Sequence, residues 1–239
     1  MAEKFTKTQI DRLGDRLRKG ILIDQDLRAL DEYRRSFGEA YEYVVRIIRE
    51  RLKLEPTGRP AKSTGSIIEK LRRESIRLSQ VQDIAGCRVV VPDVKEQDNV
   101  VSQLCSSFPG ASVVDRRDNP SFGYRAIHVI PCVDGKLIEI QVRSSLQHLW
   151  AELSERISDV LDPGIKYGVG DPKILEILVT NSEWLRNVED KERKFPSESF
   201  DIWKDHQQIN KNRKELLDHF KKLISIVETG RRKLHDCSN

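Results

Sequence analysis

Polar side chains that can bind a nucleotide or move a proton recur along FGYRAIHVIPCVDGKLIEIQVRS, residues 122–144. In an extended strand, successive side chains point to opposite faces, so every second residue shares a face. One face then collects an aromatic ring, an imidazole, a carboxylate, an amide and a guanidinium, from Tyr124, His128, Glu139, Gln141 and Arg143. A solvated face is common in antiparallel sheets, but this mixture of side chains is more typical of a binding or catalytic face.

The same segment is predicted to form a β-hairpin. Its two arms meet at Asp134-Gly135, a dipeptide that favours a two-residue type I′ turn with positive φ at both positions. This turn pairs Val133 with Lys136, Ile130 with Glu139, His128 with Gln141, and Ala126 with Arg143. The opposite face is apolar and is expected to build the core, from Ile127, Val129, Ile138, Ile140 and Val142.

A second signal lies upstream, in a basic stretch at residues 59–77. The stretch holds six Lys or Arg against two Glu, an excess that equals the formal net charge of +4 for the whole chain. A local cationic patch on an otherwise balanced chain favours a phosphate-bearing ligand or a nucleic-acid end over wrapping along a duplex. A helix is predicted from about Ser66 to Gln80, with Ser66, Lys70, Arg73 and Arg77 on one face.

Lys62, Ser63, Ser66 and Lys70 surround the start of this helix. Because the N-terminus of a helix attracts anions, these four residues are candidates for a phosphate site. The alternative is an ordinary serine cap followed by a solvated basic face. The choice between the two depends on whether acidic residues for phosphoryl chemistry lie nearby.

Two carboxylates could supply that chemistry. Asp83 stands just before the predicted strand at residues 87–91, and Glu139 lies on the polar face of the hairpin. Mg²⁺ prefers oxygen ligands and bridges phosphates, while a second acid can bind the metal or accept a proton from a hydroxyl. An aspartate before a strand is more often a turn residue, so this hypothesis needs support from the rest of the chain.

The remaining pattern predicts an α+β protein. Helical periodicity covers residues 8–54, 97–107, 145–161 and, in two helices that part near Phe195-Pro196-Ser197, 172–232. A short strand is expected at residues 111–115. This order divides the chain into an N-terminal helical extension (1–54), a mixed domain (55–170) and a C-terminal helical region (171–239).

Several functional classes find no support in the sequence. No apolar run approaches the roughly 18 residues of a membrane span, and the first residues lack the apolar core of a signal peptide. The four cysteines form no CxxC pair, which argues against a zinc site or a disulfide framework and favours a cytoplasmic location without membrane partners. No GxxxxGK[ST] loop, kinase signature or GxGxxG motif is present.

Five short motifs occur in a defined order. They are K-S-T-G-S-I-I-E-K (62–70), D-I-A-G-C-R (83–88), G-Y-R-A-I-H (123–128), E-I-Q-V-R-S (139–144) and L-W-A-E-L (149–153). Together they resemble the synthetase domain of the RelA/SpoT family, the alarmone pyrophosphokinases, over roughly residues 50–165. The resemblance implies a nucleotidyltransferase-like mixed β-sheet flanked by helices. It also implies Mg²⁺-dependent transfer of the β,γ-pyrophosphate of ATP to a ribose 3′-hydroxyl.

The resemblance also implies roles for individual residues. ATP would be bound by Arg59, Lys62, Ser66, Lys70 and Arg88. Asp83 and Glu139 would hold Mg²⁺, with Glu139 also helping to deprotonate the 3′-hydroxyl. Tyr124 would stack on the acceptor base, and His128, Gln141 and Arg143 would line the acceptor side, where Gln141 belongs to the catalytic group. Physically, these roles amount to positioning and charge neutralisation.

The sequence departs from the family pattern near the acceptor. Arg59 and Lys62 are separated by two residues where the family usually has one, which weakens the assignment of Arg59. The family commonly has Pro-Lys-x-Asn before Gly-Tyr, whereas this chain has no lysine there, and Arg116 or Arg117 is the candidate replacement. The identity of the acceptor is therefore the most open part of the prediction.

Three functions remain on the basis of the sequence. The leading one is a small (p)ppGpp synthetase that uses GDP or GTP as acceptor. The second is a toxic synthetase that pyrophosphorylates the 3′-CCA end of tRNA and is neutralised by an antitoxin. The third is a non-catalytic domain that binds nucleotide or RNA, and adenosine nucleotides are a further possible acceptor. The apolar faces of the terminal helices could bind an antitoxin or form a homo-oligomer.

Overall fold

The computed structural model describes residues 5–20, 22–59, 61–194 and 203–236, and the side chains of these except at 59, 203–206 and 231–236. Its elements are α1 (Lys7–Lys19), α2 (Asp24–Arg35), α3 (Gly38–Ile47), η1 (Ile48–Leu52), β1 (Thr57–Arg59), α4 (Thr64–Arg73), η2 (Leu78–Gln80), β2 (Ala85–Val91), α5 (Val94–Ser107), β3 (Ser112–Asp115), β4 (Ile127–Ile130), β5 (Cys132–Val133), β6 (Lys136–Ser144), α6 (Ser145–Val160), η3 (Ile165–Tyr167), α7 (Pro172–Lys194) and α8 (Trp203–Asp236). Within these residues, no helix is long and apolar enough to cross a membrane.

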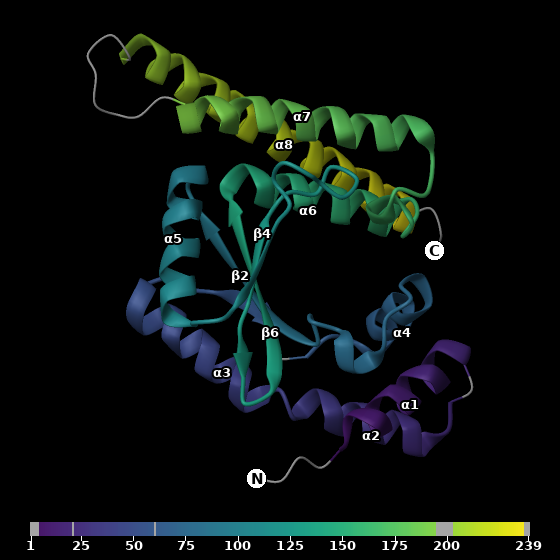
Figure 1. The fold of residues 1–239 in the computed structure, drawn as a ribbon. Coiled ribbons are helices and arrows are strands. Elements are labelled where there is room, and N and C mark those ends of the chain that lie inside the picture. The colour runs from purple at the N-terminus through teal and green to yellow at the C-terminus, as the bar shows by residue number, and fades with distance from the viewer. Residues whose placement is uncertain (1–4, 21, 60, 195–202, 237–239) are drawn as a thin grey trace. The chain divides into compact units, whose positions relative to one another are not determined.

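The strands form a six-stranded sheet with the order β1-β2-β6-β4-β3, and β5 pairs with β6 beside this path. Figure 1 shows the strands together with helices that precede, separate and follow them. β1 runs antiparallel to β2, with Arg59 opposite Gly86. The predicted α+β class, a mixed sheet flanked by helices, is confirmed.

The chain divides into two compact units, which are described separately. The first consists of Met1–Val89, Gln103–Val113 and Val129–Gln141. In this unit α1 packs against α4 and η2. Gly14 permits the close approach of α1 to η2, because a Cβ at this position would lie 2.7 Å from the Cβ of Leu78. The N-terminal helices are thereby attached to the segment that carries the predicted phosphate site.

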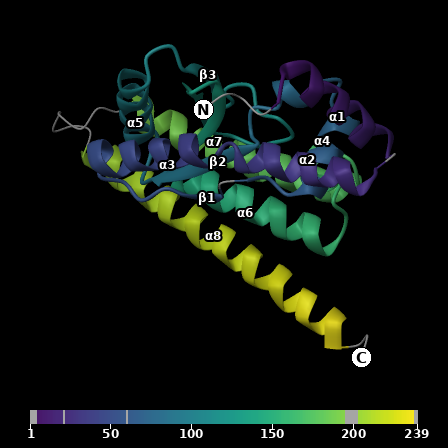
Figure 2. The same ribbon diagram turned by 90° about the horizontal axis from the view of Figure 1, so that it is seen from below.

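The second unit consists of Val90–Ser102, Val114–His128 and Val142–Asn239. Its hydrophobic core is built by α6, α7 and α8 around Trp150, Leu185 and Phe220. The indole nitrogen of Trp150 donates a hydrogen bond to the backbone oxygen of Leu178 on α7 at 2.9 Å. α7 and α8 lie side by side in Figure 1, and Figure 2 shows α8 as one unbroken helix. The predicted break near Phe195-Pro196-Ser197 lies outside the described residues.

The predicted hairpin turn is confirmed. Asp134 and Gly135 have φ angles of 49° and 73°, as a type I′ turn requires, and Val133 pairs with Lys136. The first arm is interrupted at Pro131, which accepts a bond from the backbone N–H of Ile138 at 3.1 Å but has no N–H to return. The predicted pairs farther from the turn stay predictions.

The side-chain alternation along β6 is also confirmed for the core face. Ile138, Ile140 and Val142 are fully buried, whereas Glu139 and Gln141 are half-buried. Arg143 is only 3% exposed, so the polar face becomes buried toward the end of the strand. A guanidinium in that position needs polar partners, since an unpaired buried charge is costly.

Two boundary predictions were wrong. The helix predicted to run from Ser66 to Gln80 ends at Arg73, and Arg77 therefore does not share a helical face with Lys70. The reason is tertiary: Arg18 on α1 donates hydrogen bonds to the backbone oxygens of Leu71, at 2.7 Å, and of Ile76. These bonds satisfy carbonyl groups at the helix end, where the chain turns extended.

The first arm of the hairpin is also shorter than predicted. Phe122 and Gly123 have positive φ angles of 53° and 89°, and the backbone N–H of Tyr124 bonds to the oxygen of Ser121 at 2.9 Å. This segment is therefore a second tight turn, and β4 begins only at Ile127. Tyr124 is oriented by a turn and not by the pleat of a strand.

Candidate functional site

The phosphate-site residues predicted in the first unit lie close together. The ammonium nitrogen of Lys62 lies 2.5 Å from Oδ2 of Asp83, and that of Lys70 lies 2.9 Å from Oδ1. The three side chains are between 14% and 20% exposed, so they remain accessible to a ligand while their charges are only partly screened. We call these three residues the donor cluster.

Local structure explains how the donor cluster forms. The backbone N–H of Lys62 bonds to the oxygen of Ile84 at 2.6 Å, which holds Lys62 beside the chain that leads into β2. Ser63 caps α4, since its hydroxyl oxygen accepts a bond from the backbone N–H of Ser66 at 3.2 Å. Lys70 lies one turn further along the same helix. The serine cap and the phosphate-site hypothesis are therefore compatible, because one helix N-terminus carries both.

The charge state of Asp83 follows from its neighbours. Burial by itself raises the pKa of this carboxyl, but the ammonium charges of Lys62 and Lys70 and their hydrogen bonds outweigh it. The net result is a pKa below the ordinary value, so Asp83 is ionised at neutral pH. The donor cluster thus holds two cations around one anion, an arrangement suited to exchanging that anion for phosphate.

Glu139 and Gln141 belong to the same unit. The side-chain amide of Gln141 donates a hydrogen bond of 2.7 Å to Oε2 of Glu139, as expected for alternate residues on one face of β6. Glu139 lies against Gly86 of β2, where a Cβ would stand 2.6 Å from the backbone oxygen of Glu139. Glycine at position 86 is therefore required for the close approach of these two strands.

Arg88 and Arg59 flank this region. Arg88 is half-buried on the same face of β2 as Gly86, while Cys87 is buried on the other face. Burial, together with the charge of Glu139, raises the pKa of the Cys87 thiol to about 12, so this thiol is neutral at physiological pH and is no nucleophile. Arg59 ends β1 opposite Gly86, but its side chain lies outside the described residues.

The carboxylates of Asp83 and Glu139 have the chemistry that a Mg²⁺ site requires. No group of three or more His, Cys, Asp or Glu that could hold a metal occurs in the described part of the chain. Magnesium is usually held by only one or two carboxylates, with water and substrate phosphates completing its shell. The ionised Asp83 and the half-buried Glu139, both in the first unit, are carboxylates of the kind that such a site would use.

Three of the predicted acceptor residues meet in the second unit, whereas Gln141 belongs to the first. The hydroxyl of Tyr124 is hydrogen-bonded to Nε2 of His128 at 2.9 Å and accepts a bond from Nη2 of Arg143 at 3.1 Å. The guanidinium carbon of Arg143 also lies 5.0 Å from the centre of the Tyr124 ring. These three residues form an acceptor cluster with an aromatic face, an imidazole and a positive charge, which suits a phosphorylated nucleoside.

Of the two arginines proposed to replace the missing lysine, only one reaches the turn before Tyr124. Arg116 donates a bond of 2.7 Å to the hydroxyl of Ser121, the first residue of that turn. Arg117 instead forms ion pairs of 2.6 Å each with Asp98 and Asp115. Arg116 is therefore the better candidate replacement for the missing lysine.

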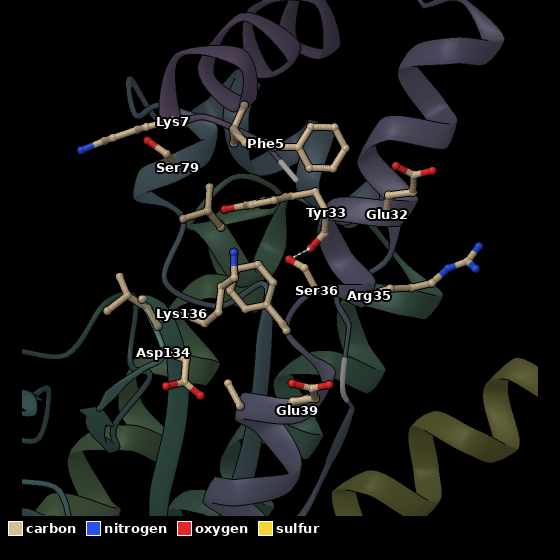
Figure 3. A pocket seen from close by; sticks show the side chains of 16 residues that line it. Phe5, Lys7, Glu32, Tyr33, Arg35, Ser36, Glu39, Ser79, Asp134 and Lys136 are labelled. Carbon is tan, nitrogen blue, oxygen red and sulfur yellow. Dashed lines mark hydrogen bonds between the residues drawn. The ribbon is translucent and has the colours of Figure 1, made fainter. Parts of the chain in front are cut away.

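A cavity of about 880 Å³ lies elsewhere in the first unit, lined by α1, α2, α3 and the hairpin turn (Figure 3). The ammonium of Lys136 stands 5.6 Å from the centre of the Tyr33 ring and 5.3 Å from that of Phe37. None of the residues predicted to act in the site lines this cavity. The candidate site and this cavity are therefore different places.

Comparison with known proteins identifies the central part of the chain. Residues 58–158 match the family model RelA_SpoT, described as the region found in RelA / SpoT proteins. The chain contains a RelA/SpoT region. All the residues predicted to act in the site, from Arg59 to Arg143, lie inside this region.

Curated relatives match over part of their length. The chain is 38% identical over 112 residues to the uncharacterized protein Rv1366 of Mycobacterium tuberculosis, covering 45% of this chain and 41% of that protein. It is 33% identical over 117 residues to the GTP pyrophosphokinase YjbM of Bacillus subtilis, covering 43% of this chain and 54% of that protein. The matched segments thus span about half the length of these relatives.

Solved structures show similarity over a larger part of the chain than the RelA/SpoT region. A GTP pyrophosphokinase family protein from Streptococcus pneumoniae is 25% identical, with a TM-score of 0.54 over 78% of this chain and 97% of that one. Small alarmone synthetase 1 from Bacillus subtilis is 25% identical, with a TM-score of 0.51 over 72% of this chain and 96% of that one. The predicted fold is confirmed, and the match over residues 58–158 supports the predicted family for this central region.

Two polar residues near the acceptor cluster were not anticipated from the sequence. Ser182 and Glu189 lie on α7 with side chains directed into the interior of the second unit, where they are 1% and 3% exposed. Together with Leu178 and Leu185 they follow the spacing of one buried helical face. Polar residues inside such an apolar stripe were the available signal, because buried polar groups need specific partners.

Proposed function

We propose that this protein is a pyrophosphokinase that transfers the β,γ-pyrophosphate of ATP to the 3′-hydroxyl of GDP or GTP. The observation that carries the proposal is the donor cluster: two lysines around an ionised aspartate, inside a RelA/SpoT region. The similarity to a GTP pyrophosphokinase of Bacillus subtilis supports the same reaction.

The donor cluster would bind ATP through its phosphates. Lys62 and Lys70 supply two positive charges, and the N-terminus of α4, capped by Ser63, supplies a favourable dipole next to Ser66. An incoming polyphosphate competes with Asp83 for the two ammonium groups. We expect the lysines to shift from Asp83 to the phosphates, which frees carboxylate oxygens of Asp83. Arg88 and Arg59 would add positive charge.

The acceptor cluster would bind the guanine nucleotide. The ring of Tyr124 offers a stacking surface for the base, while Arg143 and His128 hold that ring through its hydroxyl group. Arg116, bonded to the turn before Tyr124, would supply the positive charge of the missing lysine. Stacking alone tolerates any base, so selectivity for guanine requires further contacts that form with the nucleotide bound.

The reaction needs no covalent enzyme intermediate. The 3′-oxygen forms a bond to the β-phosphorus of ATP while the bond from that phosphorus to the α,β-bridging oxygen breaks, and AMP leaves with the electron pair. Glu139 accepts the proton of the 3′-hydroxyl, and Gln141 orients the Glu139 carboxylate through its 2.7 Å hydrogen bond. The basic residues offset the negative charge of the phosphates throughout.

Mg²⁺ would be held by Asp83 and Glu139 together with substrate phosphates, and would neutralise charge on the transferred group. Asp83 is ionised and remains partly exposed, as a metal ligand would need to be.

The test is transfer of label from ATP. Purified protein is incubated with Mg²⁺ and either γ-³²P-ATP or α-³²P-ATP, and GDP, GTP, ADP and bulk tRNA are offered separately. We expect the γ-label, and not the α-label, on GDP or GTP. Glu139→Gln is expected to reduce transfer at least about 100-fold. Glu69→Gln, which alters an exposed carboxylate on α4, serves as the matched control and should retain activity.

The other outcomes select between the alternatives. Label on tRNA alone would replace the proposal with a translation toxin and direct attention to a neutralising partner. Label on ADP alone would make the protein a synthetase of adenosine alarmones. Absence of Glu139-dependent transfer to every acceptor, although nucleotide binds, would leave a non-catalytic binding domain.

A further inference from the structure

The helix α7 lies outside residues 58–158. It nevertheless contacts the residues next to two members of the acceptor cluster, Tyr124 and Arg143. Tyr124 follows Gly123 in the chain, and Arg143 precedes Ser144. The partners of Gly123 and Ser144 therefore influence where the tyrosine ring and the guanidinium lie.

Ser182 holds the turn before Tyr124. Its hydroxyl donates a hydrogen bond to the backbone oxygen of Gly123 at 2.7 Å and accepts one from Nε of Arg125 at 2.9 Å. The turn is also packed tightly, since a Cβ at Gly123 would stand 2.6 Å from the Trp150 ring and 3.2 Å from the Cβ of Ser182. One small side chain on α7 thus contacts the residues on both sides of Tyr124.

Glu189 holds the end of β6. Its Oε1 accepts a hydrogen bond of 2.5 Å from the hydroxyl of Ser144, and its Oε2 accepts one of 2.9 Å from the amide of Gln147. Gln147 also bonds to Gln97, which in turn donates to the backbone oxygen of Val142 at 2.7 Å. The residues on both sides of Arg143 are therefore tied to one buried network.

Ser182 and Glu189 are seven residues apart on α7, which places them on the same side of the helix two turns apart. A single rigid element consequently determines the positions of both chain segments that carry the Tyr124–Arg143 contact. A buried polar network of this kind specifies one arrangement of its members when all its bonds are made.

We infer that Ser182 and Glu189 are positioning residues for the acceptor nucleotide, acting through the turn at Gly123 and the end of β6. This inference rests on the proposed function and assigns to the C-terminal helical region a part in acceptor binding. The two residues do not contact the reacting atoms. Their effect is on the spacing of Tyr124 and Arg143, which determines how a base can stack.

The test compares Ser182→Ala and Glu189→Gln with two control variants on exposed positions of the same helix, Thr180→Ala and Glu176→Gln. Ser182→Ala deletes one oxygen atom, and Glu189→Gln keeps the shape of the side chain, so both are expected to fold. Thermal unfolding of each variant checks this directly. The kcat and the KM for ATP and for GDP are then measured, together with GDP binding by calorimetry.

We expect each of the two variants to raise the KM for GDP and the Kd of GDP about fivefold, as loss of one buried hydrogen bond predicts, with the KM for ATP unchanged. The controls should match the wild type. Equal changes in both KM values, or no change in GDP binding, would overturn the inference while wild-type transfer to GDP still supports the proposed function. Failure of the wild type to bind GDP would overturn both.

Discussion

The ammonium of Lys62 lies 2.5 Å from one carboxylate oxygen of Asp83, and Lys70 takes the other oxygen at 2.9 Å. At these distances the two ammonium groups and the carboxylate stabilise one another electrostatically in the absence of substrate. They also make Asp83 the residue whose loss should affect both folding and ATP binding.

For Asp83→Asn we expect a loss of pyrophosphate transfer of at least about 100-fold, because a metal ligand and the counter-charge of two lysines disappear together. The free energy of unfolding should fall by about 1–3 kcal/mol, since two ammonium groups then face each other without their partner. Urea unfolding and transfer assays measure the two effects. The double variant Asp83→Asn with Lys62→Met should regain stability, and a further loss would contradict this account.

The ion pairs of Asp83 with the two lysines also predict how stability changes at acidic pH. The pKa of Asp83 is lowered in the folded protein, so its contribution to stability is present above the unfolded value of 3.8 and disappears as pH falls through the lower folded value. The stability difference between wild type and Asp83→Asn should therefore be constant near neutral pH and shrink only below pH 3.8. If this stability difference already vanished between pH 5 and 7, a group other than Asp83 would be responsible for it.

Tyr124 allows stacking to be separated from hydrogen bonding. Tyr124→Phe keeps the ring but removes the bonds to His128 and Arg143, and Tyr124→Leu removes the ring as well. Since stacking on a base is worth about 1–3 kcal/mol, we expect Leu to weaken GDP binding about tenfold or more, and Phe only about threefold. Calorimetric titration with GDP measures both. Equal losses in the two variants would mean that the hydroxyl, and not the ring, is what matters.

Gly123 and Gly110 test the packing around the acceptor turn. Both have positive φ angles, of 89° and 83°, but a Cβ at Gly123 would collide with Trp150, whereas no atom lies within 4 Å of one at Gly110. Gly110→Ala should cost only the backbone strain, about 1–2 kcal/mol, and Gly123→Ala about 1–3 kcal/mol more. Urea unfolding measures the difference. Equal costs would show that the turn relaxes and is not held by Trp150.

The raised pKa of Glu189 predicts that stability changes near neutral pH. Burial raises its pKa to about 7, against the hydrogen bonds from Ser144 and Gln147; Glu192 adds to this increase and Arg213 opposes it. The folded protein therefore binds a proton that the unfolded chain has released, so stability decreases as pH rises from about 4.5 to 7.

At 1.36 kcal/mol per pKa unit, the decrease amounts to about 3 kcal/mol. Urea unfolding at pH 5 and pH 8 should show it in the wild type and show a smaller decrease in Glu189→Gln. Part of the decrease should persist in that variant, because the pKa of Glu192 is raised as well, chiefly by burial. An identical pH dependence in both proteins would exclude Glu189 as its source.

Much of the donor side could be predicted from the sequence, because its geometry is local. Ser63, Ser66 and Lys70 lie within eight residues at the start of a helix, where capping and helical spacing determine their arrangement. The type I′ turn at Asp134 and the alternation along β6 are likewise properties of a few consecutive residues. Ordered motifs were also sufficient to indicate the family.

The conformation of the segments that carry the acceptor cluster depended on contacts between residues far apart in the sequence. Tyr124 was assigned to a strand, but the turn that contains it is held by Ser182 on α7, 58 residues further along the chain. The end of α4 was likewise misplaced, since Arg18 on α1 satisfies backbone oxygens beyond Leu71.

The sequence by itself determined the fold class, the serine cap of α4, the hairpin turn and the set of side chains available for chemistry, because these follow from propensity and spacing over short distances. Only the tertiary structure decided which polar groups are buried and what they bond to. Buried groups such as Glu189 and Ser182 find partners on segments tens of residues away, and no local pattern specifies such partners.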